Sequence, residues 1–156
     1  MKALIIATGK SNKPKDEPFF LTQLLGLPLI ERVIRTAKQT GVDEFVVVVD
    51  YSDKKKLKLD ERKIGAKITY VDIENRECER GDGIFVLRAK EFLNEKFVVL
   101  RADLVFDYRI LKGLINLNIK SAVVLAVERK KLSPEGVIQR ITISLKNHQR
   151  PAVVFL

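Results

Sequence analysis

Three runs of apolar residues without polar alternation constrain what this chain can fold into. They are residues 2–7 (KALIIA), 45–49 (FVVVV) and 97–100 (FVVL). A strand that faces solvent on one side alternates polar and apolar residues, whereas a strand buried on both faces of a parallel sheet is apolar throughout. We therefore predict a parallel sheet that has these strands at its centre and helices on both of its faces.

Helical patterns lie between the predicted strands. Five apolar side chains after Pro28 recur at helical spacing and form one stripe: Leu29, Ile30, Val33, Ile34 and Ala37. Pro28 suits the first turn of this helix, and Gly41 stands where its C-terminal cap belongs. Further stripes begin after Asp82 or Gly83 and after Asp107, and Asp107 is a favourable N-cap residue.

The last part of the chain departs from this alternation of strand and helix. Residues 121–127 are apolar, residues 137–145 alternate like a half-exposed antiparallel strand, and residues 152–156 (AVVFL) are apolar again. We expect one α/β domain over residues 1–156, a Rossmann-like three-layer αβα sandwich with a mostly parallel sheet and a mixed edge. The final apolar run is expected to leave an edge strand through which two copies could form a homo-oligomer.

Composition excludes several classes of protein. The single cysteine, Cys78, cannot form an internal disulfide, and with His148 as the one histidine there is no Cys/His zinc pattern. No segment approaches the roughly 20 apolar residues of a membrane helix, and no signal peptide is recognisable, so we expect a cytoplasmic protein without a membrane partner. Abundant Lys and Glu with little Cys and Met resemble thermophile composition.

The formal net charge of +9 raises the question of nucleic-acid binding. The basic residues are spread along the chain, and no strand combines aromatic and basic residues as in an RNA-recognition sheet. A polyanionic small substrate would use the same positive charge. Nucleic acid is therefore not the partner that we expect.

Asp103 stands two residues beyond the apolar run 97–100. Ligands of open α/β sheets bind just outside the carboxyl ends of the strands, where a carboxylate could hold a metal ion or a substrate. The alternative interpretation is that Asp103 simply ends the strand, since Asp is common in loops. Asp107 is better explained as a helix cap, because an apolar stripe begins just behind it.

Two loops offer further candidate sites. The backbone amides near Gly9, backed by Lys10, Lys13 and Lys15, could surround a triphosphate, although a solvated lysine loop would look the same. Residues 79–83 (ERGDG) contain two glycines that would let the backbone approach a flat ligand, or they form an ordinary turn before a helix. Neither loop contains G-x-G-x-x-G or a Walker A motif.

Five blocks of the sequence together resemble the N-terminal part of the nucleotidyltransferases with the GT-A-like fold. They are KALIIATG, the basic loop KSNKPKDEP, LLGLPLIERVIRTAKQTGVDEFVVVVD, ERGDGIFVLRAKEFL and FVVLRADLVFD, and their order and spacing match over residues 2–128. The family includes sugar-phosphate and molybdopterin nucleotidyltransferases. The similarity is strongest to the inositol-1-phosphate cytidylyltransferase branch. The resemblance implies the fold predicted above and Mg²⁺ as a cofactor.

The family opens with the signature L-A-A-G-x-G-x-R, and residues 6–9 (IATG) stand in its first half. The resemblance implies that Ala7, Thr8 and Gly9 bind a nucleotide through their backbone. Ser11 stands where the second glycine is expected. The signature is therefore degraded in this chain.

Lys13 stands where the family has a catalytic arginine, and Glu17 where it has a later lysine. Lys15 is near enough to substitute for that lysine, so the resemblance assigns a catalytic role to Lys13 and Lys15. A lysine keeps the charge of an arginine but loses the planar fork that aligns a phosphate, and a glutamate would repel an anionic substrate.

Asp103 matches the magnesium-binding aspartate of the family, and Gly83 lies in the segment that contacts the base. A second magnesium-binding aspartate and most of the acceptor pocket lie in the later half of the family. We therefore expect the chain to be short at its C-terminus relative to the family.

The expected function is transfer of a nucleoside monophosphate from a nucleoside triphosphate, CTP first, to a sugar phosphate or inositol phosphate, with release of pyrophosphate. The alternative is a degenerate, non-catalytic relative that binds a nucleotide or a partner protein. The altered signature and the abrupt apolar end of the sequence favour this alternative.

Overall fold

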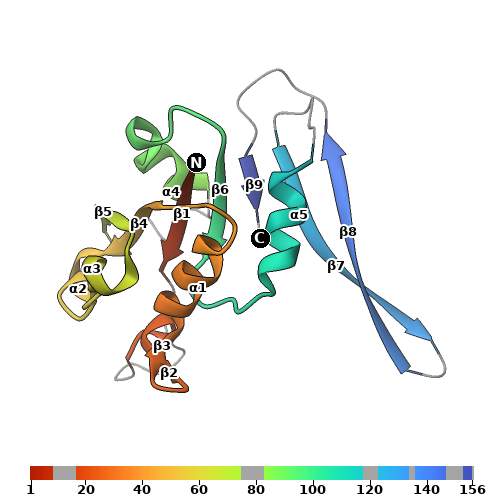
Figure 1. The fold of residues 1–156 in the computed structure, drawn as a ribbon, viewed down its shortest axis with the longest axis horizontal. Helices are drawn as coiled ribbons and strands as arrows, with labels where there is room; N and C mark the ends of the chain where they lie inside the picture. Colours follow the sequence, from red (N-terminus) through yellow and green to blue (C-terminus); the bar gives the residue numbers. More distant parts are fainter. Residues whose placement is uncertain (9–16, 75–82, 118–122, 134–135, 147–152, 156) are drawn as a thin grey trace.

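The computed structural model describes residues 1–8, 17–74, 83–117, 123–133, 136–146 and 153–155, and for the last three ranges it describes the backbone alone. The described chain forms a seven-stranded sheet flanked by helices, with a separate two-stranded hairpin. Figure 1 shows the first strand near the centre of the fold and, at one side of the same sheet, a long hairpin of two strands.

The seven strands stand in the order β5, β4, β1, β6, β9, β7, β8 across the sheet. Neighbouring strands are parallel throughout except for β7 and β8, which are antiparallel. The predicted mostly parallel sheet with a mixed edge is therefore confirmed. The strand bounds are β1 Lys2–Ala7, β4 Glu44–Asp50, β5 Lys67–Ile73, β6 Phe97–Arg101, β7 Val123–Ser133, β8 Gly136–Lys146 and β9 Val153–Phe155.

Helices and a short hairpin connect these strands. The small sheet pairs β2 with β3 in antiparallel orientation. The bounds of these elements are η1 Phe19–Leu21, β2 Gln23–Leu24, β3 Leu27–Pro28, α1 Leu29–Lys38, α2 Tyr51–Lys54, α3 Glu61–Ile64, α4 Gly83–Arg88, η3 Lys90–Phe92 and α5 Tyr108–Ile115.

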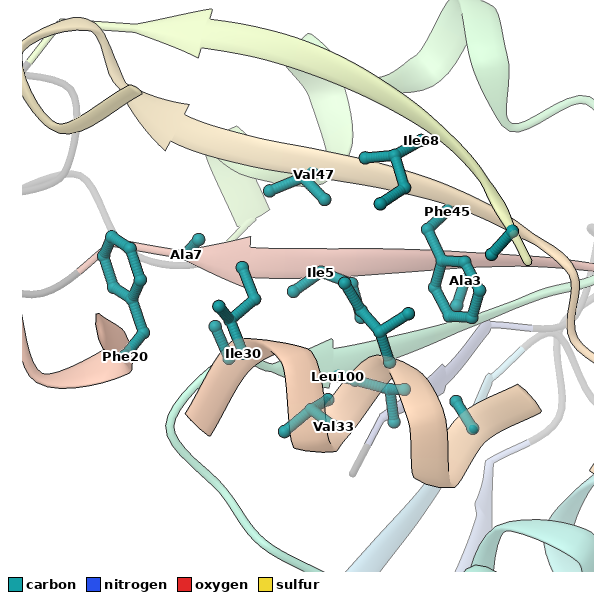
Figure 2. Close-up of a cluster of buried hydrophobic side chains, with 14 of the residues drawn as sticks. Ala3, Ile5, Ala7, Phe20, Ile30, Val33, Phe45, Val47, Ile68 and Leu100 are labelled. Carbon is teal, nitrogen blue, oxygen red and sulfur yellow. The ribbon is translucent and has the colours of Figure 1, made fainter. Parts of the chain in front are cut away.

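The apolar run of β1 is buried on both faces of the sheet, as its sequence predicts. Ala3, Ile5 and Ala7 belong to the core that α1 and α5 cover. Leu4 and Ile6 belong to a second core that includes residues of α4. Figure 2 shows the first of these cores, with side chains of β1 facing those of α1. The three-layer αβα sandwich is thus confirmed.

The predicted N-cap of α5 is confirmed, whereas the C-cap of α1 is Gln39, two residues before the predicted Gly41. Gly41 has a φ of +89°, a left-handed conformation that glycine adopts without steric cost, and its amide donates to the carbonyl of Lys38 at 3.0 Å. Pro28 precedes α1 as its N-cap residue and is not in its first turn. Asp107 is the N-cap of α5, and its side chain accepts a hydrogen bond from the amide of Arg109.

The prediction of a C-terminal edge strand is wrong. β9 lies inside the sheet, with Val153 paired to Phe97 of β6 on one side and to Val123 of β7 on the other. Its apolar residues suit this position, because an interior parallel strand is covered by neighbours on both sides. The edges of the sheet are β5 and β8, so β9 does not offer the free edge on which the expected oligomer contact rested.

Among the residues that the structure describes, no helix is long and apolar enough to cross a membrane.

Candidate functional site

β1 and β6 are parallel neighbours in the interior of the sheet, so their carboxyl ends lie side by side. Ile6 is in register with Arg101, and the amide of Ala102 donates a hydrogen bond of 3.0 Å to the carbonyl of Ile6. The chain leads from β1 through α1 to β4 on one side, whereas β6 stands on the other side of β1. This is the topological switch point at which open α/β sheets bind ligands.

The predicted residues Ala7, Thr8 and Asp103 come together at this switch point. Ala7 is buried as the last residue of β1, and Thr8 follows it half-buried. Asp103 is half-buried in a turn in which the amide of Leu104 donates to the carbonyl of Arg101 at 3.4 Å. The backbone that precedes Asp103 is therefore fixed to the strand that precedes Thr8.

Arg101 holds the carboxylate of Asp103 with two hydrogen bonds. Its Nε donates to Oδ1 at 3.0 Å and its Nη2 donates to Oδ2 at 2.9 Å. The side chains are 45% and 29% exposed, respectively, so solvent screens the pair. Exposed ion pairs of this kind stabilise a fold by about 0–1 kcal/mol. The pair therefore orients the carboxylate more than it stabilises the protein.

The residues at the switch point fit a metal ion that a nucleotide brings with it. The described residues contain no group of three or more His, Cys, Asp or Glu side chains that could hold a metal by themselves. Mg²⁺ is commonly bound by one or two carboxylates together with substrate phosphates and water. Asp103 can supply one such carboxylate, because each of its oxygens keeps a second lone pair beside the hydrogen bond from Arg101.

Asp107 does not share the surroundings of Asp103. Hydrogen bonds from the side chain and the backbone of Arg109 lower the pKa of its carboxyl from 3.8 to about 2. Both of its oxygens accept from Nε of Arg109, at 2.9 Å and 3.0 Å. Asp107 therefore caps the N-terminus of α5, as the sequence predicts.

Gly83 is the first residue of α4 and is exposed. Because α4 follows β5 and leads back towards the start of β6, its first residue lies on the carboxyl side of the sheet. A Cβ atom built at Gly83 would have no other atom within 4 Å. The fold by itself therefore does not require glycine at this position.

The remaining predicted site residues, Gly9, Lys13 and Lys15, lie outside the residues that the structure describes, as does Asp82.

Arg101 is the residue that sequence reasoning missed. The spacing in the sequence did not reveal the contact, because Asp103 lies in the turn after β6, where the alternation of side chains along a strand no longer applies. Asp50 is a further carboxylate at the carboxyl ends of the parallel strands, because it is the last residue of β4, the other neighbour of β1. It accepts hydrogen bonds from the amide and the hydroxyl of Ser52, at 2.8 Å and 2.6 Å, and is the N-cap of α2.

A comparison with protein families gives the context of this site. The model of the MobA-like NTP transferase domain matches residues 3–151. The chain belongs to this family. The nucleotidyltransferase resemblance carried by the sequence blocks is therefore confirmed, and the chain is a MobA-like NTP transferase domain.

Curated relatives of this NTP transferase domain include two kinds of bifunctional protein. The chain is 32% identical over 107 residues to the bifunctional protein GlmU of Acetivibrio thermocellus. The aligned region covers 66% of this chain and 22% of that protein. It is 32% identical over 105 residues to the bifunctional IPC transferase and DIPP synthase of Rubrobacter xylanophilus. This aligned region covers 65% of this chain and 23% of that protein. The match thus spans about a quarter of the length of these relatives.

Solved structures show the same fold. The inositol-1-phosphate CTP transferase from T. maritima superposes with a TM-score of 0.63 at 19% identity, over 80% of this chain and 53% of that one. A UTP-bound UGPase from Acinetobacter baumannii superposes with a TM-score of 0.58 at 20% identity, over 88% of this chain and 66% of that one. At these identities the likeness supports the fold of the NTP transferase domain and not its substrates.

Proposed function

We propose that this NTP transferase domain moves a nucleoside monophosphate from a nucleoside triphosphate to a sugar phosphate or inositol phosphate and releases pyrophosphate. The observation that carries the proposal is the position of Asp103, beside the end of β1 at the switch point of a sheet of this family. CTP with inositol 1-phosphate is the first pair to test, because an inositol-1-phosphate CTP transferase shares the fold and an IPC transferase is among the relatives.

The reaction is an in-line substitution at phosphorus. A phosphate oxygen of the acceptor attacks the α-phosphorus of the nucleoside triphosphate, a new oxygen–phosphorus bond forms, and the bond to the bridging oxygen of the β-phosphate breaks. The electron pair of that bond leaves with pyrophosphate. A protein assists such a reaction mainly by positioning the reactants and neutralising the negative charge that develops.

Each candidate residue has a part in this proposal. Asp103 would hold Mg²⁺, which supplies positive charge next to the triphosphate oxygens when it is bound. Lys13 and Lys15 would neutralise the leaving pyrophosphate.

The nucleotide itself would be bound mainly by main-chain groups. The backbone of Ala7, Thr8 and Gly9 would contact the nucleotide, and Gly83 would let the main chain approach the base. Support for these roles comes from the family match over residues 3–151 and from the backbone pairing that sets the end of β1 beside the residue before Asp103.

A pyrophosphate-release assay tests the proposal. The four nucleoside triphosphates are each combined with inositol 1-phosphate, glucose 1-phosphate and N-acetylglucosamine 1-phosphate in the presence of Mg²⁺. We expect release for at least one pair, and a loss of about 100-fold or more in the Asp103→Asn variant. The matched control is Asp72→Asn, which removes a carboxylate that pairs with Lys54 at 2.9 Å on the edge strand β5. Absence of release for every pair would refute the proposal.

A second candidate function is nucleotide binding without catalysis. It is favoured by the Arg101 side chain, which engages both oxygens of the candidate metal ligand, and by Ser11 and Lys13 in place of the family's glycine and arginine. Calorimetry distinguishes the two functions. Tight binding of a nucleoside triphosphate without pyrophosphate release supports the binding module, whereas the lack of any nucleotide binding refutes both.

A further inference from the structure

Arg101 and Asp103 form a compact pair of opposite charges at the carboxyl end of β6. The guanidinium uses Nε and Nη2 for the carboxylate, at 3.0 Å and 2.9 Å, which is the two-pronged geometry that arginine also uses for phosphate. Each oxygen keeps a second lone pair, but the guanidinium places a positive charge directly beside the carboxylate. Because a divalent cation would be repelled by this charge, Arg101 weakens the binding of a metal ion to Asp103.

The exposure of the pair makes an exchange of partners feasible. The side chain of Arg101 is 45% exposed and that of Asp103 is 29% exposed, so a ligand can reach the pair from solvent. A triphosphate carries more negative charge than one carboxylate and presents several oxygens to a planar donor. It would thus be the stronger partner for the guanidinium.

We propose that Arg101 is a phosphate-binding residue that shields Asp103 while the site is empty and transfers to a phosphate group of the incoming nucleotide, which frees the carboxylate for the metal ion. This inference rests on the proposed function for the identity of the ligand. It adds an order of events, because Asp103 binds the metal ion more strongly once a polyphosphate has drawn the positive charge of Arg101 away.

Binding of inorganic tripolyphosphate in the presence of EDTA tests the phosphate half of the proposal without metal or turnover. Calorimetry on the full chain should give about tenfold weaker binding for Arg101→Gln than for the wild type, the usual loss for one charge-assisted contact. Arg101→Lys keeps the charge without the fork, so its affinity should lie between the two.

Arg109→Gln is the matched control for these variants. It removes the same charge from an arginine that also pairs with an aspartate two residues away, but at the start of α5. Its tripolyphosphate affinity should equal that of the wild type. Equal affinities for the wild type and Arg101→Gln would overturn the proposal, as would an equal loss in Arg101→Gln and Arg109→Gln.

Paramagnetic broadening by Mn²⁺ tests the shielding half. Without tripolyphosphate, the backbone amide signals of Asp103 and Leu104 should broaden at about tenfold lower Mn²⁺ in Arg101→Gln than in the wild type. In Arg109→Gln these two signals should respond as in the wild type. Identical Mn²⁺ profiles for the wild type and Arg101→Gln would overturn the proposal.

These results are separable from those of the transfer assay. A wild type that releases pyrophosphate while Arg101→Gln binds tripolyphosphate normally would refute the inference and leave the proposed function standing. A wild type that releases none while both binding tests give the expected differences would refute the proposed function and leave the partner exchange standing.

Discussion

The amide of Ala102 donates a hydrogen bond of 3.0 Å to the carbonyl of Ile6, which continues the pairing of β6 with β1 one residue beyond the end of β6. Thr8 and Asp103 both follow this bond closely in the sequence. The two halves of the candidate site are therefore set by backbone pairing and not by contacts between their side chains. Substitutions at the site should change ligand binding with little effect on folding.

Gly83 gives one such test. Gly83→Ala places a methyl group in open space and reduces the freedom of the unfolded chain, so we expect the free energy of unfolding to stay equal or rise by up to about 1 kcal/mol. If the main chain at residue 83 approaches the base, nucleotide affinity should nevertheless fall. Urea unfolding and calorimetry with CTP measure the two effects. Gly113→Ala in α5 is the control, because a Cβ atom there also meets nothing within 4 Å, and it should leave CTP affinity unchanged.

The pair of Asp107 and Arg109 predicts an unusual titration. The pKa of Asp107 should be about 2, below its ordinary value of 3.8, and Arg109→Gln should raise it. Because the folded-state pKa is the lower one, this contribution to stability is fully present above about pH 4 and is lost as the pH falls through about 2. Carboxyl carbon shifts followed by NMR from pH 1.5 to 6 measure the pKa. An unchanged pKa in Arg109→Gln would contradict the assignment of the cause.

Two leucines test how far burial determines stability. Leu111 of α5 is 0% exposed, so Leu111→Ala should lower the free energy of unfolding by about 2–5 kcal/mol through lost contacts and a cavity. Leu87 of α4 is 63% exposed, so the same substitution there should change it by less than about 0.5 kcal/mol. Urea unfolding of both variants provides the comparison. Equal effects would mean that α5 is not packed on the sheet as described.

The turn between β2 and β3 contains a strained residue. Leu25 has a φ of +49° and is 88% exposed, and Gly26 follows with a φ of +81°. A leucine in the left-handed region costs roughly 1–2 kcal/mol, whereas asparagine tolerates it. We expect Leu25→Asn to raise the free energy of unfolding by about 0.5–1 kcal/mol.

Leu24→Asn is the control for the turn, because Leu24 lies in β2 outside the residues with positive φ. It should give no gain in stability. A Leu25→Asn variant that unfolds at the same urea concentration as the wild type, or at a lower one, would contradict the strain argument.

The sequence by itself determined the layers of this protein. Apolar runs such as 45–49 and 97–100 can be buried only with neighbours on both faces, and the stripe of α1 has one side for the sheet, so local periodicity was sufficient for the αβα sandwich. The N-cap at Asp107 was also predictable, and so was a glycine turn at Gly41 just beyond α1, because both depend on a few adjacent residues. The candidate carboxylate, Asp103, could be named from its place after a buried strand.

Only the tertiary structure decided which strands are neighbours and which charges meet. The sequence around β9 is equally apolar whether it lies at an edge or in the interior, and pairing with β6 and β7 joins residues far apart in the chain. Likewise, the sequence shows that Arg101 and Asp103 carry opposite charges but not that they touch. The turn after β6 brings their side chains into a contact of two parallel hydrogen bonds. Periodicity reports the face on which a residue lies, whereas partner choice depends on the geometry of the whole sheet.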